Sequence, residues 1–253
     1  MSLKLMIKAV QQDLPVTVIH EKWMVENPEP EWSDRALDFA ANQLAGVTGS
    51  RRRRKVMFRA SGASTCARQQ VLKYIGHPGI KEQFSSAQVN IFTTGNFFHL
   101  KWQMQGLTAG WLAEAEVPVE RADLNAGGTA DGVLAAGGGW ECKSINDRGF
   151  ARVMNYGPLL EHLDQMDNYM LLGDWERYSI VYENKNDGEW REFVHHRDEK
   201  RMKDVVERFE QLNLFVEDKK LPVILPDCKK GEGTKFRQCP FKDTCLKLKG
   251  WPV

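Results

Sequence analysis

Two short stretches decide how this chain of 253 residues folds: TADG at residues 129–132 and WECKS at residues 140–144. The segments around them favour strands, and three consecutive glycines at residues 137–139 favour a tight turn, so we expect an antiparallel hairpin. Side chains alternate along a strand, so Glu141 and Lys143 share one face while Cys142 enters the opposite layer. Asp131 then lies opposite or diagonal to that pair.

This hairpin would bring two carboxylates and an ammonium group to one surface. Hard divalent cations bind oxygen ligands, and Mg2+ takes one or two carboxylates and leaves its other positions to water and substrate phosphate. Lys143 could orient or deprotonate a water molecule, or neutralise charge on a phosphate. From these residues alone, the alternative is a salt bridge on the surface of a hairpin.

Hydrophobic periodicity extends the interpretation to the rest of the chain. Helices are expected at residues 34–44, 64–74, 93–105, 159–172 and 198–215, and further strands at residues 115–120, 177–184 and 189–194. This order predicts an α/β fold with a mixed central sheet flanked by helices. A hydrophobic content of 42%, a charged content of 27% and a net charge of +1 are typical of a soluble globular chain and exclude a strongly basic coat.

An Asp on one strand and Glu-x-Lys on the next resembles the metal site of the PD-(D/E)xK nuclease superfamily, although Ala130 replaces the literal proline. Gly95-x-x-x-His99 and Gln165-x-x-x-Tyr169 resemble motifs of its RecB-like branch. The resemblance implies a restriction-endonuclease-like core. It also implies Mg2+ or Mn2+ ligands at His99, Asp131, Glu141 and the Cys142 carbonyl, with Asp131, Glu141, Lys143, Gln165 and Tyr169 as catalytic residues.

The motif residues outside the hairpin also have simpler interpretations. Gln165 and Tyr169 are four residues apart, so they project from one face of a helix, where both could touch DNA or brace Lys143. Taken alone, Tyr169 could be a core aromatic, Gln165 a solvated helix residue, and His99 a structural histidine. Glu116, on the preceding strand, could be an outer carboxylate near the metals or an exposed strand residue.

Four of the five cysteines remain once Cys142 is assigned to the inner layer: Cys66, Cys228, Cys239 and Cys245. Four thiolates could bind zinc or an iron–sulfur cluster, or stay unligated, and the close Cys-x-x-Cys pairs of zinc ribbons are missing. One distant cysteine followed by a trio resembles the iron–sulfur subgroup of RecB-like nucleases, which includes AddB-type and CRISPR-associated nucleases. That likeness implies a structural 4Fe-4S cluster that would join distant parts of the chain.

The sequence divides into three expected parts. Residues 1–60 would be an N-terminal accessory element, residues 61–225 the nuclease core, and residues 226–253 a cysteine-rich basic tail packed on the core through the cluster. Arg51 to Lys55 are five consecutive basic residues, and residues 228–250 hold seven basic and two acidic ones. Both segments favour contact with a phosphate backbone, although residues 51–55 could also be a solvated loop.

These features together predict a metal-dependent deoxyribonuclease that acts on DNA with a free end or on single strands. The resemblance implies an exonuclease of phage or bacterial recombination or repair, with a recombination or replication protein as a candidate partner. Within the class of nucleases, the alternative is a structure-specific endonuclease or a CRISPR spacer-processing nuclease. Outside that class, the alternative is a DNA-binding or protein-binding module that does not cut. The sequence shows no long apolar span or secretory signal, so we expect a cytoplasmic location.

Overall fold

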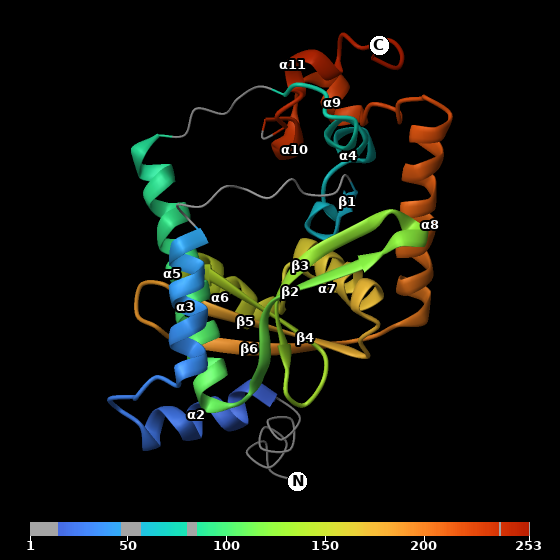
Figure 1. Ribbon diagram of the computed structural model, residues 1–253. Helices are drawn as coiled ribbons and strands as arrows, with labels where there is room; N and C mark the ends of the chain where they lie inside the picture. The colour runs from blue at the N-terminus through green and yellow to red at the C-terminus, as the bar shows by residue number, and fades with distance from the viewer. Residues whose placement is uncertain (1–14, 47–56, 80–84, 238, 253) are drawn as a thin grey trace.

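The computed structural model describes residues 15–46, 57–79, 85–237 and 239–252, and their strands form one mixed sheet with helices on both faces (Figure 1). The strands are β1 (Phe58–Arg59), β2 (Leu112–Arg121), β3 (Ala126–Leu134), β4 (Gly139–Ile145), β5 (Arg177–Asn184) and β6 (Trp190–His196). The helices are α2 (Pro15–Glu26), α3 (Asp34–Gly46), α4 (Ala67–Tyr74), α5 (Ser86–Ala109), α6 (Asp147–Tyr156), α7 (Leu160–Gly173), α8 (Glu199–Glu217), α9 (Pro226–Lys230), α10 (Gly233–Arg237) and α11 (Lys242–Cys245), and the 3₁₀ turns are η1 (Ala60–Gly62) and η2 (Ala122–Leu124). The expected α/β architecture is confirmed.

Strand β3 organises the sheet because three strands pair with it. Antiparallel β2 follows its whole length along one edge. The other edge is shared: β1 pairs in parallel with residues 126–127, and β4 pairs antiparallel with residues 132–133. Among the described strands, none pairs with residues 128–131 on this side, and we call that stretch the open edge of β3. Beyond β4, the sheet continues with parallel β5 and antiparallel β6.

The turn between β3 and β4 forms where the glycines predicted it. The backbone N–H of Leu134 donates to the carbonyl of Gly138 at 2.9 Å. Gly137 and Gly138 adopt φ values of +84° and +97°, which L side chains rarely tolerate. A Cβ at Gly138 would also lie 2.6 Å from the Arg177 carbonyl oxygen. The hairpin therefore depends on glycine for both its dihedral angles and its packing.

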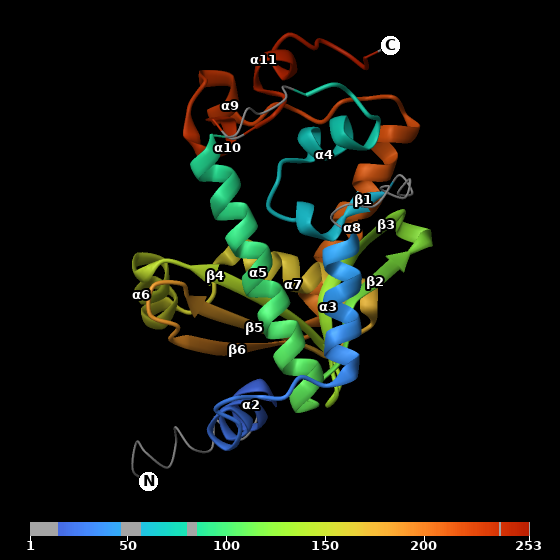
Figure 2. The same ribbon diagram turned by 60° about the vertical axis from the view of Figure 1, so that its left-hand side comes forward.

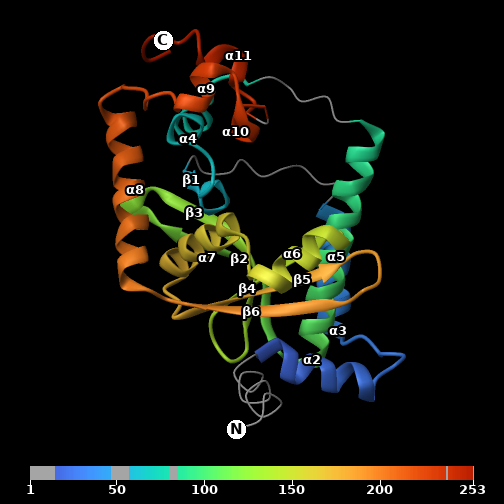
Figure 3. The same cartoon turned by 180° about the vertical axis from the view of Figure 1, so that it is seen from behind.

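Two hydrophobic clusters lie on the two faces of the sheet. One joins the sheet to α6, α7 and α8, with Tyr178, Ile180 and Phe209 among its fully buried members. The other joins it to α2, α3 and α5 around buried tryptophans, including Trp102 and Trp140. Figures 2 and 3 show the two groups of helices on opposite sides of the strands. Strand β4 is thus covered from both sides up to the point where it leaves β3.

Helix α5 is longer than the sequence pattern predicted. It begins at Ser86, because the Ser85 side chain and Gln88 form a reciprocal capping box, and not at the expected residue 93. Its first two turns are exposed, including the apolar Val89, Ile91 and Phe92, so they have no buried face of the kind that helical periodicity predicts. Helix α6 was not expected at all. Only ten residues long, it contains Gly149 in its first turn, and the Asn146 side chain caps it.

A buried ionic network holds α7 against β6 and α8. Asp167 lies 2.8 Å from His195 Nε2, and Arg201 Nε donates to its other carboxylate oxygen at 2.6 Å. Burial opposes ionisation of Asp167, but these hydrogen bonds prevail and hold its pKa below the usual 3.8. The network fixes the helix that carries Gln165 and Tyr169.

The described N-terminal residues pack directly on the sheet. At the start of α2, the backbone N–H of Thr17 donates to the buried Glu192 carboxylate of β6 at 2.9 Å, and the Thr17 hydroxyl donates at 3.1 Å. The basic run from Arg51 to Lys55 lies outside the described residues. In the part of the chain that is described, every helix is too short or too polar to cross a membrane. The proposed division at residue 60 stays a prediction.

Candidate active site

The acidic residues of the hairpin gather at the open edge of β3. The β3–β4 ladder has only two residue pairs, of which Gly132 with Trp140 is the last. Asp131 and Glu141 stand immediately beyond that pair. From there β4 continues along β5 and no longer along β3. The opening between the two strands therefore receives one carboxylate from each.

Alternation along β4 separates its three central residues as the sequence predicted. Glu141 is only 3% exposed, forms an ion pair with Lys143, and lies on the side of α7. Cys142 is fully buried in the opposite cluster, beside Trp102 and Trp140. The carboxylate and the ammonium group thus share one face of the sheet.

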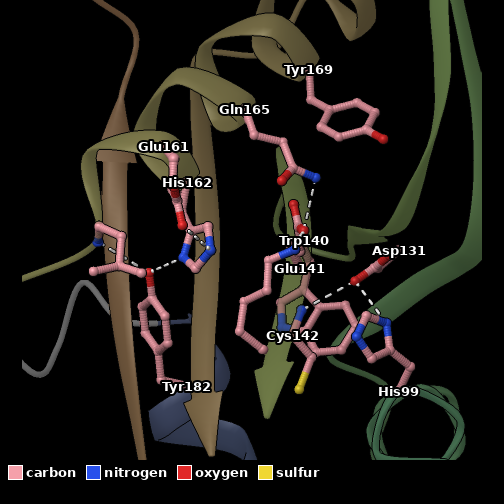
Figure 4. Close-up of polar contacts among 12 residues, drawn as sticks. His99, Asp131, Trp140, Glu141, Cys142, Glu161, His162, Gln165, Tyr169 and Tyr182 are labelled. Atoms are coloured by element: carbon pink, nitrogen blue, oxygen red, sulfur yellow. Dashed lines mark hydrogen bonds and ion pairs between the residues drawn. The ribbon is translucent and has the colours of Figure 1, made fainter. Parts of the chain in front are cut away.

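Asp131 links this strand to α5 (Figure 4). Its Oδ2 lies 3.1 Å from His99 Nδ1 and accepts a hydrogen bond of 3.2 Å from the backbone N–H of Cys142. His99 is in the middle of α5, which crosses β4 on the tryptophan side of the sheet. A histidine and an aspartate from distant parts of the sequence therefore meet beside Glu141.

Helix α7 contributes from the other side. Gln165 Nε2 donates to Glu141 Oε1 at 2.9 Å, and Tyr169 Oη donates to the backbone carbonyl of Thr129 at 2.8 Å. Figure 4 shows both side chains on the same side of α7. Thr129 belongs to the open edge of β3, so the tyrosine satisfies a carbonyl that none of the described strands pairs with there.

The carboxylates of the opening set the charge of the groups around them. Burial raises the pKa of Glu141 above its usual 4.5. The positive charge of Lys143 acts to lower this pKa, and the negative charge of Asp131 acts to raise it further. Burial alone would lower the pKa of Lys143, but Glu141 and Asp131 prevail and raise it. At His99 the hydrogen bond to Asp131 likewise overcomes burial and raises the pKa above 6.5. The two carboxylates thus favour the protonated forms of both Lys143 and His99.

The donor set fits a hard divalent cation. Two carboxylates, one imidazole and the main-chain carbonyl of Cys142 are ligands that Mg2+ and Mn2+ accept. In the described part of the chain, no three His, Cys, Asp or Glu side chains are arranged closely enough to hold a metal ion as they stand. Asp131 and Glu141 pair instead with His99 and Lys143. For a cation to bind, the Lys143 ammonium would have to leave Glu141, and His99 would have to give up the ring proton that faces Asp131 in order to act as a ligand.

Glu116 stands on β2, next to the same opening. Gln103, a buried residue of α5 that the sequence analysis missed, donates through Nε2 to Glu116 Oε1 and to the Asp131 carbonyl, both at 2.9 Å. Glu116 has φ = +54°, an uncommon value for a residue with a side chain. A role as an outer carboxylate stays a prediction.

The sequence analysis also missed His162 of α7. Its Nδ1 lies 2.6 Å from the Tyr182 hydroxyl, which accepts from the backbone N–H of Leu159 (Figure 4). Burial and the positive charges of Lys143 and Arg152 lower the pKa of His162 to about 4, so it is neutral at physiological pH. Its position three residues before Gln165, on the same helix face, is the signal that could have revealed it.

Four cysteines line one pocket between α4 and the C-terminal helical turns: Cys66, Cys228, Cys239 and Cys245. None of these described cysteines forms a disulfide. Burial raises the pKa of Cys228, and the charges of the other three thiols raise it further, as expected for thiols that face one another. The structure thus brings together the four cysteines that the sequence grouped, in what we call the cysteine pocket. What they bind stays a prediction.

Arg68 of α4 fastens the tail beside this pocket. Its guanidinium donates to Cys245 Sγ at 3.2 Å and to the carbonyls of Pro222 and Leu248 at 2.9 and 2.7 Å. At the start of the same helix, the Cys66 sulfur accepts from the backbone N–H of Gln69 at 3.4 Å. Figure 1 shows α9, α10 and α11 gathered at the α4 end of the molecule. Arg68 and the backbone of Gln69 thus each donate to one sulfur of the pocket, but as they stand no three of its described cysteines are arranged closely enough to hold a metal ion.

Solved structures share this arrangement of elements. An alkaline exonuclease from Laribacter hongkongensis, in complex with dAMP, superposes with a TM-score of 0.52 at 14% identity, covering 64% of this chain and 88% of that one. A second structure of that exonuclease gives a TM-score of 0.51 at 14% identity over 63% and 87% of the two chains. This chain therefore shares the fold of those structures. The protein SSO0001 matches the same fold with a TM-score of 0.50 at 18% identity, over 84% of this chain and 97% of that one. No family model and no curated protein matches the sequence.

Proposed function

We propose that the protein is a divalent-metal-dependent deoxyribonuclease of the PD-(D/E)xK type, and specifically an exonuclease. One observation carries the proposal: Asp131, Glu141 and Lys143 converge with His99 and Gln165 where β3 and β4 separate. The fold shared with an alkaline exonuclease also supports a nuclease activity. A structural salt bridge on a hairpin would not explain why residues from four separate elements meet there.

In this proposal Asp131, Glu141 and His99 hold Mg2+ or Mn2+, together with the Cys142 carbonyl. The metal would supply polarisation of the phosphate and activation of a water molecule. Lys143, whose pKa the carboxylates raise, stays protonated and neutralises charge that develops on the phosphate while it orients the water. Gln165 would hold Glu141 in position, and Tyr169 would brace the open edge of β3 along the substrate path.

The test is cleavage of end-labelled single-stranded and duplex DNA, with Mn2+ or with a chelator. We expect stepwise loss of terminal nucleotides in Mn2+ and none with the chelator or with Glu141→Gln. Circular single-stranded DNA distinguishes an exonuclease from an endonuclease, because an exonuclease cannot cut a molecule without ends. Cleavage of circles would indicate a structure-specific endonuclease or a CRISPR spacer-processing nuclease.

A non-cutting DNA-binding module on a nuclease scaffold is the alternative of another class. It predicts DNA binding without products in Mg2+ or Mn2+, and unchanged binding after Glu141→Gln. Support for the enzyme over the module comes from the buried Glu141, which keeps both Lys143 and Gln165 as partners. A carboxylate kept for scaffolding alone would need neither of them.

We further propose that the cysteine pocket holds a 4Fe-4S cluster, with zinc as the alternative. Support comes from the four thiols around one pocket and from the hydrogen bonds of Arg68 and Gln69 to two sulfurs. Anaerobically purified protein should be brown and contain about four irons per chain. Colourless protein with one zinc per chain would assign the same residues to a structural zinc site.

The biological setting follows from these proposals. By the resemblance to RecB-like nucleases, such an exonuclease would serve phage or bacterial recombination or repair, with a recombination or replication protein as its partner. The five basic residues from Arg51 to Lys55 and the basic tail would contact the DNA backbone. If serine replacements throughout residues 51–55 leave DNA affinity and its salt dependence unchanged, that segment is a solvated loop.

A further inference from the structure

Helix α7 turns a stripe of polar side chains toward three strands of the sheet. His162, Gln165 and Tyr169 follow one another at spacings of three and four residues, so they share one face of the helix. Each contacts a different strand: His162 reaches β5, Gln165 reaches β4 and Tyr169 reaches β3. The proposed function uses the last two of these side chains. His162, at the β5 end of the stripe, has no role in it.

The contact with Tyr182 places the His162 imidazole beside Lys143. Tyr182 pairs with Lys143 in the parallel ladder of β4 and β5, so these two side chains point to the same face of the sheet. The His162 ring stacks on the Tyr182 ring with 5.6 Å between the centroids. Figure 4 shows the imidazole on the side of Tyr182 that faces Glu141. His162 therefore borders the same opening as the candidate metal ligands.

The hydrogen bonds of Tyr182 fix the tautomer of His162. The Tyr182 hydroxyl oxygen accepts from the backbone N–H of Leu159 at 3.4 Å and lies 2.6 Å from His162 Nδ1. Among the described residues, that nitrogen is the one acceptor for the tyrosine proton, so the hydroxyl donates to Nδ1. Because its pKa is lowered to about 4, the imidazole is neutral and holds a single ring proton. This proton must therefore be on Nε2.

The Nε2 proton has no acceptor in the described part of the chain. Glu161 Oε1 lies 4.0 Å from Nε2, which is beyond hydrogen-bonding distance, and the Glu161 side chain is 60% exposed. The His162 side chain is partly accessible, at 16% exposed. The positive charges of Lys143 and Arg152 both act on the imidazole. An unused N–H donor with two cations nearby suits an anionic oxygen.

We propose that His162 binds the substrate in the active site, where its Nε2–H donates to a non-bridging oxygen of the phosphate held beside Lys143. The inference rests on the proposed function and deepens it, because it adds a neutral donor next to the ammonium group. Lys143 neutralises charge on this phosphate, whereas His162 orients it, since a hydrogen bond is directional and a point charge is not. Tyr182 is a positioning residue, because it holds the imidazole in the tautomer that donates.

The experiment combines variants of His162 with chemically altered single strands. Each strand carries one methylphosphonate, which replaces a charged non-bridging oxygen with a methyl group, at one of the first three linkages from either end. The two diastereomers are used separately. Affinity is measured by fluorescence anisotropy in Ca2+, because this readout does not require cleavage. Single-turnover cleavage of unmodified DNA is measured in Mn2+.

The variants separate the Nε2 donor from the packing of the ring. His162→Phe keeps a ring against Tyr182 and lacks the donor, so cleavage of unmodified DNA should fall about 10-fold to 100-fold. His162→Gln can place an amide N–H near the position of Nε2 and should recover part of the rate. Tyr182→Phe should lower the rate less than His162→Phe, because the donor remains but its tautomer is no longer fixed. His196→Phe is the matched control, since this histidine is exposed at the end of β6.

The decisive readout is the coupling between His162 and one phosphate oxygen. One methylphosphonate diastereomer at one linkage should lower the affinity of the wild-type protein about 10-fold or more, and that of His162→Phe much less, because the variant has already lost the contact. A merely structural role would leave the two proteins equally sensitive. Circular dichroism and melting temperature establish that each variant folds. If His162→Phe does not fold, His162→Asn gives the same comparison, because its amide reaches the position of Nδ1 but not that of Nε2.

Two outcomes separate this inference from the proposed function. If the wild-type protein cleaves DNA but every methylphosphonate lowers the affinity of wild type and His162→Phe by the same factor, His162 touches no phosphate and the inference is wrong. If His162→Phe removes the effect of one diastereomer but the wild-type protein cleaves nothing in Mg2+ or Mn2+, the contact stands and the nuclease proposal fails.

Discussion

The substitution Lys143→Met tests the active-site proposal most directly. It should strongly reduce the rate of cleavage and leave the fold intact. Methionine keeps the apolar stem and removes only the charge. Removing one preorganised group that stabilises developing charge costs about 100-fold to 1,000-fold in rate, or about 3 to 4 kcal/mol. The loss of stability should be smaller. Glu141 keeps its 2.9 Å hydrogen bond from Gln165, so we expect a loss of about 1 to 3 kcal/mol from its unpaired charge.

The assay is single-turnover cleavage of an end-labelled strand in saturating Mn2+, with DNA binding measured separately in Ca2+. Mn2+ affinity, measured by calorimetry, is the second readout. It should not fall in Lys143→Met, because the lysine is a cation that competes for Glu141 and is not a ligand. Lys143→Arg should recover part of the rate by restoring the charge. Lys220→Met is the matched control, since this lysine is 70% exposed.

Two results would refute the reasoning. Full activity in a folded Lys143→Met protein would mean that the hairpin is not the catalytic centre. A large loss of Mn2+ affinity, with the rate restored at high Mn2+, would mean that Lys143 positions the metal ligands and does not act on the phosphate.

Three further predictions concern neighbouring features. Gln165→Leu removes the 2.9 Å hydrogen bond to Glu141 and should lower Mn2+ affinity about 10-fold to 100-fold, measured by calorimetry, and unchanged affinity would contradict the bracing role. Cys245→Ala should give colourless protein while Cys142→Ala stays brown, and the reverse pattern of iron content would show that the wrong quartet was chosen. Asp167→Asn should cost about 2 kcal/mol in urea unfolding at neutral pH. The pKa of Asp167 is lower in the folded protein than its usual 3.8. The ionised carboxylate therefore stabilises the fold fully above pH 3.8, and this stabilisation is lost as the pH falls through the lower folded pKa. The destabilisation caused by Asp167→Asn should accordingly become smaller at acidic pH.

The hairpin was predictable because local rules determine it. Three glycines fix the turn, and alternation then assigns Glu141 and Lys143 to one face and Cys142 to the other. The α/β class and the approximate positions of the strands follow from similar short-range patterns. His99 could be placed beside Asp131 only through the resemblance to a family, since no spacing rule connects residues so far apart in the sequence.

Other features depend on tertiary contacts that local patterns do not encode. The open edge of β3 exists because β1, only two residues long, pairs with the far end of the edge that β4 also uses. Periodicity does not detect a two-residue strand, so the gap between β1 and β4 could not be expected. The first two turns of α5 and the whole of α6 were missed because the former leave their apolar residues exposed and the latter is short and contains a glycine.

The attachment of Arg68 to the tail has a consequence for biosynthesis. Arg68 and Cys245 are separated by 177 residues, so at typical rates of about 5 to 20 residues per second the first is made roughly 10 to 35 seconds before the second. During that interval α4 has emerged, yet its buried guanidinium lacks the acceptors that Cys245 and Leu248 will provide. A nascent chain stalled in this interval would display the Arg68 cation without these acceptors and the Cys66 thiol without the three cysteines that later face it.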